Sequence, residues 1–189
     1  MTQRAIVIGV SSGGMAALSY LFSVLPDSFV TPIIIVQHVG ARSDSQWIQW
    51  LDEKYHLNIS EAGEKEPVLP SHIYIAPPNY HLLIEADKTF SLTIDERVNF
   101  ARPSIDVLFE SAADAYGEQL TGILLTGSNH DGAKGLHYIH QQGGCTIIQD
   151  PDTAEAATMP SSALKLFQPD HILPLEGIAA LLIKKETNP

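Results

Sequence analysis

The sequence is built from short, continuous runs of branched apolar residues that alternate with segments of helical periodicity. A run that is apolar at every position must be buried on both faces, as are strands in a parallel sheet covered by helices. Such runs lie at Ala5–Ile8, Pro32–Val36, Thr121–Leu125 and Cys145–Ile148, with a weaker one at His171–Leu173. The pattern predicts a doubly wound, mostly parallel α/β sheet of the Rossmann-like type.

Apolar residues at helical spacing predict the segments between these strands. One predicted helix has Met15, Leu18, Leu21 and Phe22 on its apolar face, and a second has Trp47, Trp50 and Leu51. Further helices are predicted after Ser104 and over Gly132–Gln142, Met159–Phe167 and Gly177–Lys185. The middle of the chain differs, because Ile73–Ala76, His81–Glu85 and Phe90–Ile94 are short strand candidates separated by turn residues. They predict a short antiparallel excursion around residues 72–94.

Length and charge limit the class of protein. A chain of 189 residues with 44% hydrophobic residues fits one domain, residues 1–189, that buries its own core. The lone Cys145 cannot form an internal disulfide, and neither a signal peptide nor a bilayer-spanning run is recognisable, so we expect a cytoplasmic protein that is not membrane-embedded. A net charge of −11 repels phosphate backbones and argues against nucleic-acid binding.

Three polar loops follow predicted parallel strands, at the strand ends where open α/β sheets bind ligands. The loops are Gly9-Val10-Ser11-Ser12-Gly13-Gly14, Gln37-His38-Val39-Gly40 and Thr126-Gly127-Ser128-Asn129-His130-Asp131-Gly132. Together they offer the hydroxyl of Ser11, the imidazole of His38 and the carboxylate of Asp131. Hydrolysis of esters and amides uses this set as nucleophile, base and orienting acid, so the loops predict a serine hydrolase.

Each of these features also has another interpretation. Gly9–Gly13 fits the pattern G-x-S-x-G. A glycine-rich turn after a first strand, here Gly9–Gly14, also builds anion sites, which makes a small-molecule or nucleotide-binding protein one alternative. Asp131 precedes a predicted helix and is a suitable cap for its N-terminus. A metal site formed by His130, Asp131, His137 and His140 is a further alternative, because two of these histidines lie three residues apart on one helix.

At these residues the sequence resembles the catalytic domain of the chemotaxis protein-glutamate methylesterases, the CheB family, from Ile6 to about Leu182. The three loops match the family's serine, histidine and aspartate loops. Further matching blocks lie at Tyr74–Pro78, Arg102–Phe109, Gln149–Pro151 and Met159–Pro160. The resemblance implies a doubly wound parallel sheet with Ser11 as nucleophile, His38 as general base and Asp131 as the carboxylate that orients it.

The resemblance also implies the substrate and the remaining site residues. The family hydrolyses glutamyl γ-methyl esters on the cytoplasmic helices of chemoreceptors, which yields glutamate and methanol, and it also deamidates glutamine there. Ser12 stands where the family has a small hydroxylic residue, expected to help position the imidazole, and backbone N–H groups near Ser128 are the expected oxyanion donors. Neither a metal nor a cofactor is implied, because the triad generates its own nucleophile and water completes turnover.

Two departures from the family pattern bear on activity and control. The family's aspartate loop usually reads Gly-Met-Gly-x-Asp-Gly, whereas Ser128, Asn129 and His130 precede the aspartate here, so a catalytically silent paralogue is another alternative. The family commonly carries an N-terminal receiver domain, whereas the first predicted strand here begins at Ala5. We therefore expect a stand-alone catalytic domain that is constitutively open or controlled by a separate regulatory protein.

Overall fold

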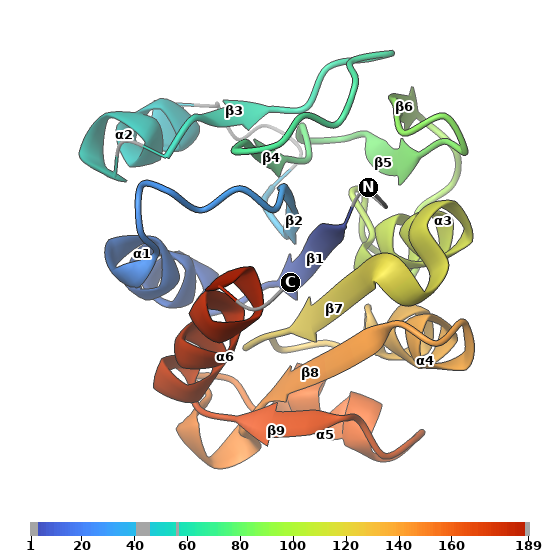
Figure 1. Ribbon diagram of the computed structural model, residues 1–189. Helices are drawn as coiled ribbons and strands as arrows, with labels where there is room; N and C mark the ends of the chain where they lie inside the picture. Colours follow the sequence, from blue (N-terminus) through green and yellow to red (C-terminus); the bar gives the residue numbers. More distant parts are fainter. Residues whose placement is uncertain (1–3, 41–45, 56, 188–189) are drawn as a thin grey trace.

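The computed structural model of the chain describes residues 4–40, 46–55 and 57–187, and within them seven strands form one parallel sheet (Figure 1). The strand order is β3-β4-β2-β1-β7-β8-β9. The strands are β1 (Ala5–Val10), β2 (Ile33–Gln37), β3 (Ile59–Glu61), β4 (Ile73–Ile75), β7 (Leu120–Leu124), β8 (Cys145–Gln149) and β9 (His171–Leu173). The chain first builds outward from β1 and later returns to its other side with β7, so the sheet's switch point lies between β1 and β7.

Helices cover both faces of the sheet, as the apolar runs predict. One face carries α1 (Gly14–Val24), α2 (Gln46–Tyr55) and α6 (Leu175–Thr187), and the other carries α3 (Ile105–Tyr116), α4 (Ala133–Gln141) and α5 (Thr158–Leu164). Short 3₁₀ turns lie at Gly117–Gln119 and Pro151–Thr153. None of the helices within the described residues is long and apolar enough to cross a membrane.

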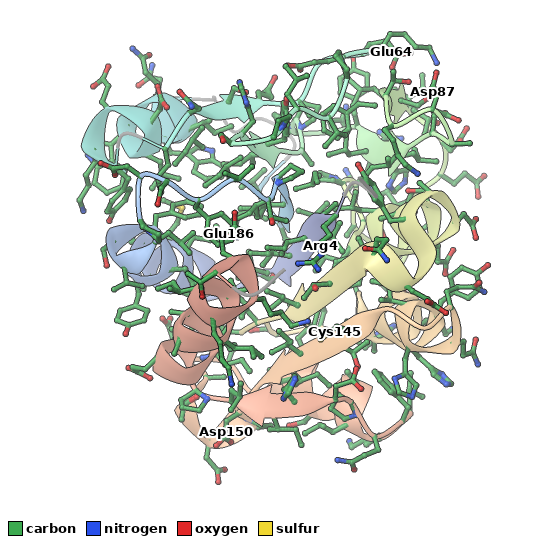
Figure 2. The ribbon with its side chains drawn as sticks, in the orientation of Figure 1. Arg4, Glu64, Asp87, Cys145, Asp150 and Glu186 are labelled. Atoms are coloured by element: carbon green, nitrogen blue, oxygen red, sulfur yellow. The ribbon has the colours of Figure 1, made fainter. Side chains whose placement is uncertain are left out.

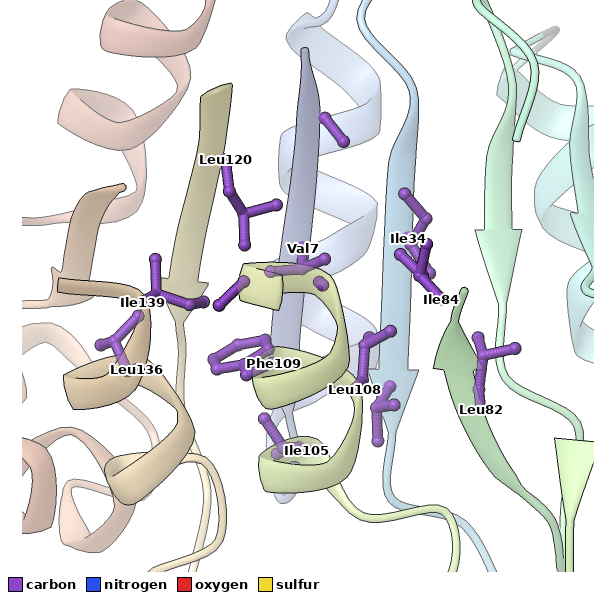
Figure 3. Close-up of a cluster of buried hydrophobic side chains, with 14 of the residues drawn as sticks. Val7, Ile34, Leu82, Ile84, Ile105, Leu108, Phe109, Leu120, Leu136 and Ile139 are labelled. Atoms are coloured by element: carbon purple, nitrogen blue, oxygen red, sulfur yellow. The ribbon is translucent and has the colours of Figure 1, made fainter. Parts of the chain in front are cut away.

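Alternating residues of each central strand supply the two hydrophobic cores. In β1, Ile6 and Ile8 pack among the side chains of α1 and α6, whereas Val7 packs on the opposite face. Figure 3 shows this second core, in which Val7 lies close to Phe109 of α3. Because successive side chains of a strand point to opposite faces, a strand buried on both sides must be apolar throughout.

The middle of the chain confirms one part of the sequence prediction and corrects another. Strands β5 (His81–Ile84) and β6 (Phe90–Thr93) pair antiparallel, and they form a separate two-stranded sheet. The assignment of Ile73–Ala76 to the antiparallel part was wrong, since β4 pairs parallel with β2. The edge strand Ile59–Glu61 was missed, because three residues carry too little periodicity to predict a strand.

Two predicted apolar helix faces also need correction. In α1 the buried face is made by Ala17, Leu18, Leu21 and Phe22, while Met15 is 37% exposed at the start of the helix. In α2 Ile48 and Leu51 are buried and Trp47 packs, partly buried, against the same core, as predicted for Trp47 and Leu51, but Trp50 is 47% exposed. The side chain of Trp50 instead lies under the Lys54 ammonium, 4.5 Å from its ring centroid, which is a cation–π contact.

The lone cysteine lies where the strands begin, at the edge of the sheet opposite the predicted site. Arg4, Cys145 and Glu186, labelled in Figure 2, line a cavity of about 270 Å³ at this edge. Burial raises the pKa of the Cys145 thiol above its ordinary value, although Lys185 opposes the shift. The thiol is therefore kept in its protonated, unreactive form.

Gly132, which separates Asp131 from α4, has no room for a side chain. Its φ is +90°, and an added Cβ would lie 2.6 Å from both Ile105 Cγ2 and Leu124 Cδ1. Gly117 also has a positive φ, +52°, but an added Cβ would meet nothing within 4 Å. A substitution at Gly117 therefore introduces backbone strain alone, whereas one at Gly132 introduces both backbone strain and steric overlap.

We expect Gly132→Ala to lower the free energy of unfolding by about 3 kcal/mol or more, since strain and overpacking add. Gly117→Ala, a control with backbone strain at φ +52° and ψ −127° but no overlap, should cost about 2 kcal/mol. Urea denaturation of both variants measures the difference. Equal losses in the two variants would contradict the packing argument.

Candidate active site

The three loops predicted to carry the chemistry meet at the carboxyl ends of β1, β2 and β7, which are neighbours in the sheet. His38 follows β2 and Asp131 lies in the loop after β7, and His38 Nε2 is 2.8 Å from Asp131 Oδ2. Ser11 follows β1 and lines the same cleft as His38. The parallel register places all three at one edge, as the sequence predicted.

The cleft at this edge has a volume of about 330 Å³, within the range typical of small-ligand sites. Its wall is formed by Ser11, His38, Val39, Gly40, Asn129 and the segment Arg97, Asn99–Pro103. Asp131 lies beneath this surface, with its side chain wholly buried. The arrangement exposes a hydroxyl and an imidazole to a ligand while it removes the carboxylate from water.

The buried carboxylate of Asp131 is compensated by five donors. They are His38 Nε2 (2.8 Å), Ile105 N (2.6 Å), Asp106 N (3.2 Å), Ser104 Oγ (2.8 Å) and Asn99 Nδ2 (2.9 Å). Burial alone would raise the pKa of the Asp131 carboxyl, but these hydrogen bonds, that from His38 foremost, bring it below its ordinary value. The carboxylate is therefore held ionised beside the imidazole.

Asp131 does cap a helix, but not the helix that follows it. The residue at the N-cap of α4 is Gly132, which has no side chain, and a carboxylate of another helix, that of Asp106, accepts from Gly135 N in the first turn of α4 at 2.7 Å. The Asp131 carboxylate instead accepts the first backbone N–H groups of α3, at Ile105 and Asp106. The positive end of the α3 dipole thus adds to the stabilisation of the negative charge.

The ring of His38 has a defined tautomer, fixed by Asn129. Asn129 Oδ1 accepts the backbone N–H of Asp131 at 3.0 Å, which leaves its Nδ2 to face His38 Nδ1 at 3.1 Å. An amide NH₂ group can only donate, so Nδ1 must carry the lone pair and Nε2 the proton. His38 therefore donates from Nε2 to Asp131, and Nδ1 is the nitrogen available as a base.

The loop after β1 is held to its neighbours through the backbone of Ser11. Its N–H donates to Thr126 O at 2.9 Å, and its carbonyl accepts from Gln37 Nε2 at 3.1 Å. Gln37 Nε2 also donates to His38 O at 3.0 Å, so one side chain joins the serine and histidine loops. Within the described residues no hydrogen bond uses Ser11 Oγ, and His38 Nδ1 is contacted by Asn129 Nδ2.

Ser12 and Ser128 lie side by side at the surface. Ser128 Oγ donates to Ser12 Oγ at 2.9 Å, so the Ser12 hydroxyl contacts this serine and not the imidazole of His38. The backbone N–H of Ser128 donates to no acceptor among the described residues, whereas that of Gly127 donates to Ala156 O. An oxyanion role for the loop at Ser128 stays a prediction that this free donor supports.

Three residues that position the site were not identified from the sequence: Asn99, Asp106 and Asn129. Asn99 Nδ2 joins Asp131 to Asp106 Oδ2, at 2.9 and 2.8 Å. Burial and the charge of Asp131 raise the pKa of the Asp106 carboxyl, while Gly135 N donates to it. The available signals were the departure from the family's aspartate loop at Asn129 and the polar Asp106 on an otherwise apolar helix face.

The histidines of the metal alternative have other roles. The rings of His137 and His140 pack on Phe167, with centroids 5.0 and 5.2 Å away, and Asp131 faces α3. The described residues contain no group of three or more His, Cys, Asp or Glu side chains placed to hold a metal ion. The structure therefore does not bring together the ligands that this alternative needs.

The sequence is similar to one family along nearly its whole length. The family model described as CheB methylesterase matches residues 6–182. A protein of Leptospira interrogans, named as a candidate protein-glutamate methylesterase/protein-glutamine glutaminase, is 53% identical over 188 residues, which cover 100% of this chain and 97% of that protein. These matches support the esterase interpretation and not the nucleotide-binding alternative.

Other relatives are longer. Proteins of Nitrosospira multiformis and Pseudomonas aeruginosa named as protein-glutamate methylesterase/protein-glutamine glutaminase are 38% and 36% identical over 95% and 97% of this chain. The chain spans 50% and 53% of their lengths. The crystal structure of the Thermotoga maritima CheB methylesterase catalytic domain matches with a TM-score of 0.93 and 32% identity, covering 98% of this chain and 100% of that one.

We expect Asn129→Ala to raise kcat for ester hydrolysis about fivefold. The variant removes a hydrogen bond, worth about 1 kcal/mol, that must break before His38 Nδ1 can accept a proton. The tautomer survives because Asp131 still accepts from Nε2. Steady-state kinetics on an activated ester measures the change, and a fall in kcat would instead show that Asn129 is needed to orient the ring.

The depressed pKa of Asp131 predicts a pH dependence of stability. A carboxyl whose folded pKa lies below the ordinary 3.8 contributes stability above that pH, and the contribution is lost as the pH falls through the folded pKa. The difference in unfolding free energy between wild type and Asp131→Asn should therefore shrink below about pH 4. Denaturation at pH 3, 4 and 7 measures it, and a constant difference would contradict the assignment.

Proposed function

The chain belongs to the CheB methylesterase family, and on that basis we propose that its cleft hydrolyses glutamyl γ-methyl esters on chemoreceptor-like proteins, releasing methanol and leaving glutamate. The observation that carries the proposal is the buried pair of His38 and Asp131. His38 Nε2 lies 2.8 Å from a carboxylate that is wholly buried, and the imidazole faces the cleft that Ser11 lines. This pair supplies the base and the orienting carboxylate of the proposed triad, and it supports Ser11 as the nucleophile.

In the proposed reaction, Ser11 Oγ attacks the ester carbonyl while His38 Nδ1 takes the hydroxyl proton. Asp131 accepts from Nε2 throughout, so it stabilises the imidazolium that forms without itself taking the proton. The C–O bond to the methoxy group then breaks, and Nδ1 returns the proton to the leaving methanol. The product of this first half of the reaction is an ester between the glutamyl γ-carbonyl group and Ser11 Oγ.

Water completes the cycle by the same steps. It attacks the acyl carbonyl and gives its proton to His38 Nδ1, and as the C–O bond to Ser11 breaks, Nδ1 returns that proton to Ser11 Oγ and glutamate is released. A γ-amide would follow the same course with ammonia as the leaving group, which supports glutamine deamidation as a second reaction of this cleft. The backbone N–H of Ser128 is the proposed donor to the oxyanion of both tetrahedral intermediates.

The neighbouring serines provide a sharp test. We expect Ser11→Ala and His38→Ala to lower kcat on a methylated receptor fragment by about 10,000-fold or more, because the triad acts as a unit. Ser12→Ala should lower it less than about tenfold, since its hydroxyl contacts Ser128 and not the imidazole. Methanol release measures turnover, and thermal melts establish that each variant is folded.

A Ser11→Ala variant that retains wild-type methanol release would end the proposal. A larger loss of kcat in Ser12→Ala than in Ser11→Ala would identify Ser12, and not Ser11, as the nucleophile. A protein that hydrolyses activated esters but not the receptor fragment would keep the hydrolase chemistry and reject the proposed substrate.

A further inference from the structure

Phe100 combines two features that each cost free energy, an apolar side chain exposed to solvent and a strained backbone conformation. Its side chain is 89% exposed, and its φ of +65° lies in the left-handed region that bulky residues avoid. Asn99 before it is also left-handed, with φ +51°. Strain of this kind persists only where the surrounding structure enforces it, and it concentrates at functional sites.

The turn that carries Phe100 is fastened to the catalytic carboxylate. Its ends pair through two backbone hydrogen bonds between Val98 and Ala101, of 3.1 and 2.9 Å. The side chain of Asn99 donates to the buried Asp131 at 2.9 Å. The position of the exposed ring is therefore determined by the same group that orients the base.

Phe100 also lines the cleft that holds Ser11 and His38. A γ-methyl ester reaches Ser11 only at the end of a glutamate side chain, so the polypeptide that carries the ester must pass the mouth of this cleft. An exposed aromatic ring at that mouth is thus within reach of the carrier rather than of the ester.

Two more exposed apolar residues come from loops tied to the same turn. Tyr80 is 42% exposed and Ile94 is 68% exposed. Arg102, which lines the cleft, donates from Nη1 to Ile94 O at 2.7 Å and from Nη2 to Asn79 Oδ1 at 2.9 Å. One guanidinium therefore holds the loops of Tyr80, Ile94 and Phe100 together, and these three residues are called the cleft rim below.

We propose that the cleft rim binds apolar side chains of the polypeptide that carries the esterified glutamate, with Phe100 as the main anchor. The proposal rests on the proposed function, since it assigns the surface that selects a protein-borne ester. Rigid aromatic residues dominate the affinity of such surfaces because little side-chain freedom is lost on binding. The strain at Phe100 is the local cost of keeping its ring available.

The net charge of the chain favours a polypeptide over a lipid surface at the cleft rim. Asp95 and Glu96 are exposed directly beside Ile94, Arg97 and Arg102 line the cleft beside them, and the chain as a whole has a net charge of −11. The local charges are therefore mixed, whereas the net negative charge of the whole chain would repel the anionic headgroups of a membrane. A helix with apolar side chains one turn from the ester avoids this repulsion.

Two helical peptides test the proposal. Both carry one glutamyl γ-methyl ester, with leucines four residues to either side in the first and serines in the second. Affinities are measured by fluorescence anisotropy in a Ser11→Ala background, so that no turnover occurs. We expect the leucine peptide to bind about 30-fold more tightly than the serine peptide, and Phe100→Ala to abolish this preference.

The control is Val30→Ala, which removes another exposed apolar side chain, 52% accessible, at the opposite edge of the sheet. It should retain the full preference. Equal affinity for the two peptides, or a preference that survives Phe100→Ala, overturns the proposal. A wild-type enzyme that binds the leucine peptide preferentially but releases no methanol from it rejects the proposed function while the binding surface stands.

Discussion

The site depends on how one buried negative charge is compensated. Asp131 is wholly excluded from water, and an ionised carboxylate in that position is tolerated only if hydrogen bonds replace its hydration. The five donors come from the histidine loop, the start of α3 and the turn at Asn99. Each donor that stabilises the charge also fixes the segment from which it comes, so compensation and positioning are the same interaction.

A second layer of polar contacts extends this arrangement. Asp106 shares the amide of Asn99 with Asp131 and accepts Gly135 N at the start of α4, which couples the two helices on that face of the sheet. Gln37 joins the serine and histidine loops from the other side. The residues that depart from the family's aspartate loop lie at the surface of this network, where Asn129 contacts His38 Nδ1 and Ser128 contacts Ser12.

The strands were predictable where burial determines the residue types. β1 and β2 lie in the middle of the sheet, must be apolar on both faces, and therefore stand out as unbroken branched runs. The same rule fails at the edge, because β3 and β4 have three residues each and their pairing depends on the strands beside them. Helices were located by periodicity, but Met15 and Trp50 show that periodicity alone does not say which side faces the core.

The sequence by itself determined the fold class and the edge of the sheet at which Ser11, His38 and Asp131 would meet, because a parallel sheet places the ends of neighbouring strands together. Only the tertiary structure decided what each group does there. The helix that Asp131 caps, the ring nitrogen that stays unprotonated and the residues that support both are set by hydrogen bonds between segments far apart in the chain. Such bonds depend on direction and distance, and local sequence patterns encode neither.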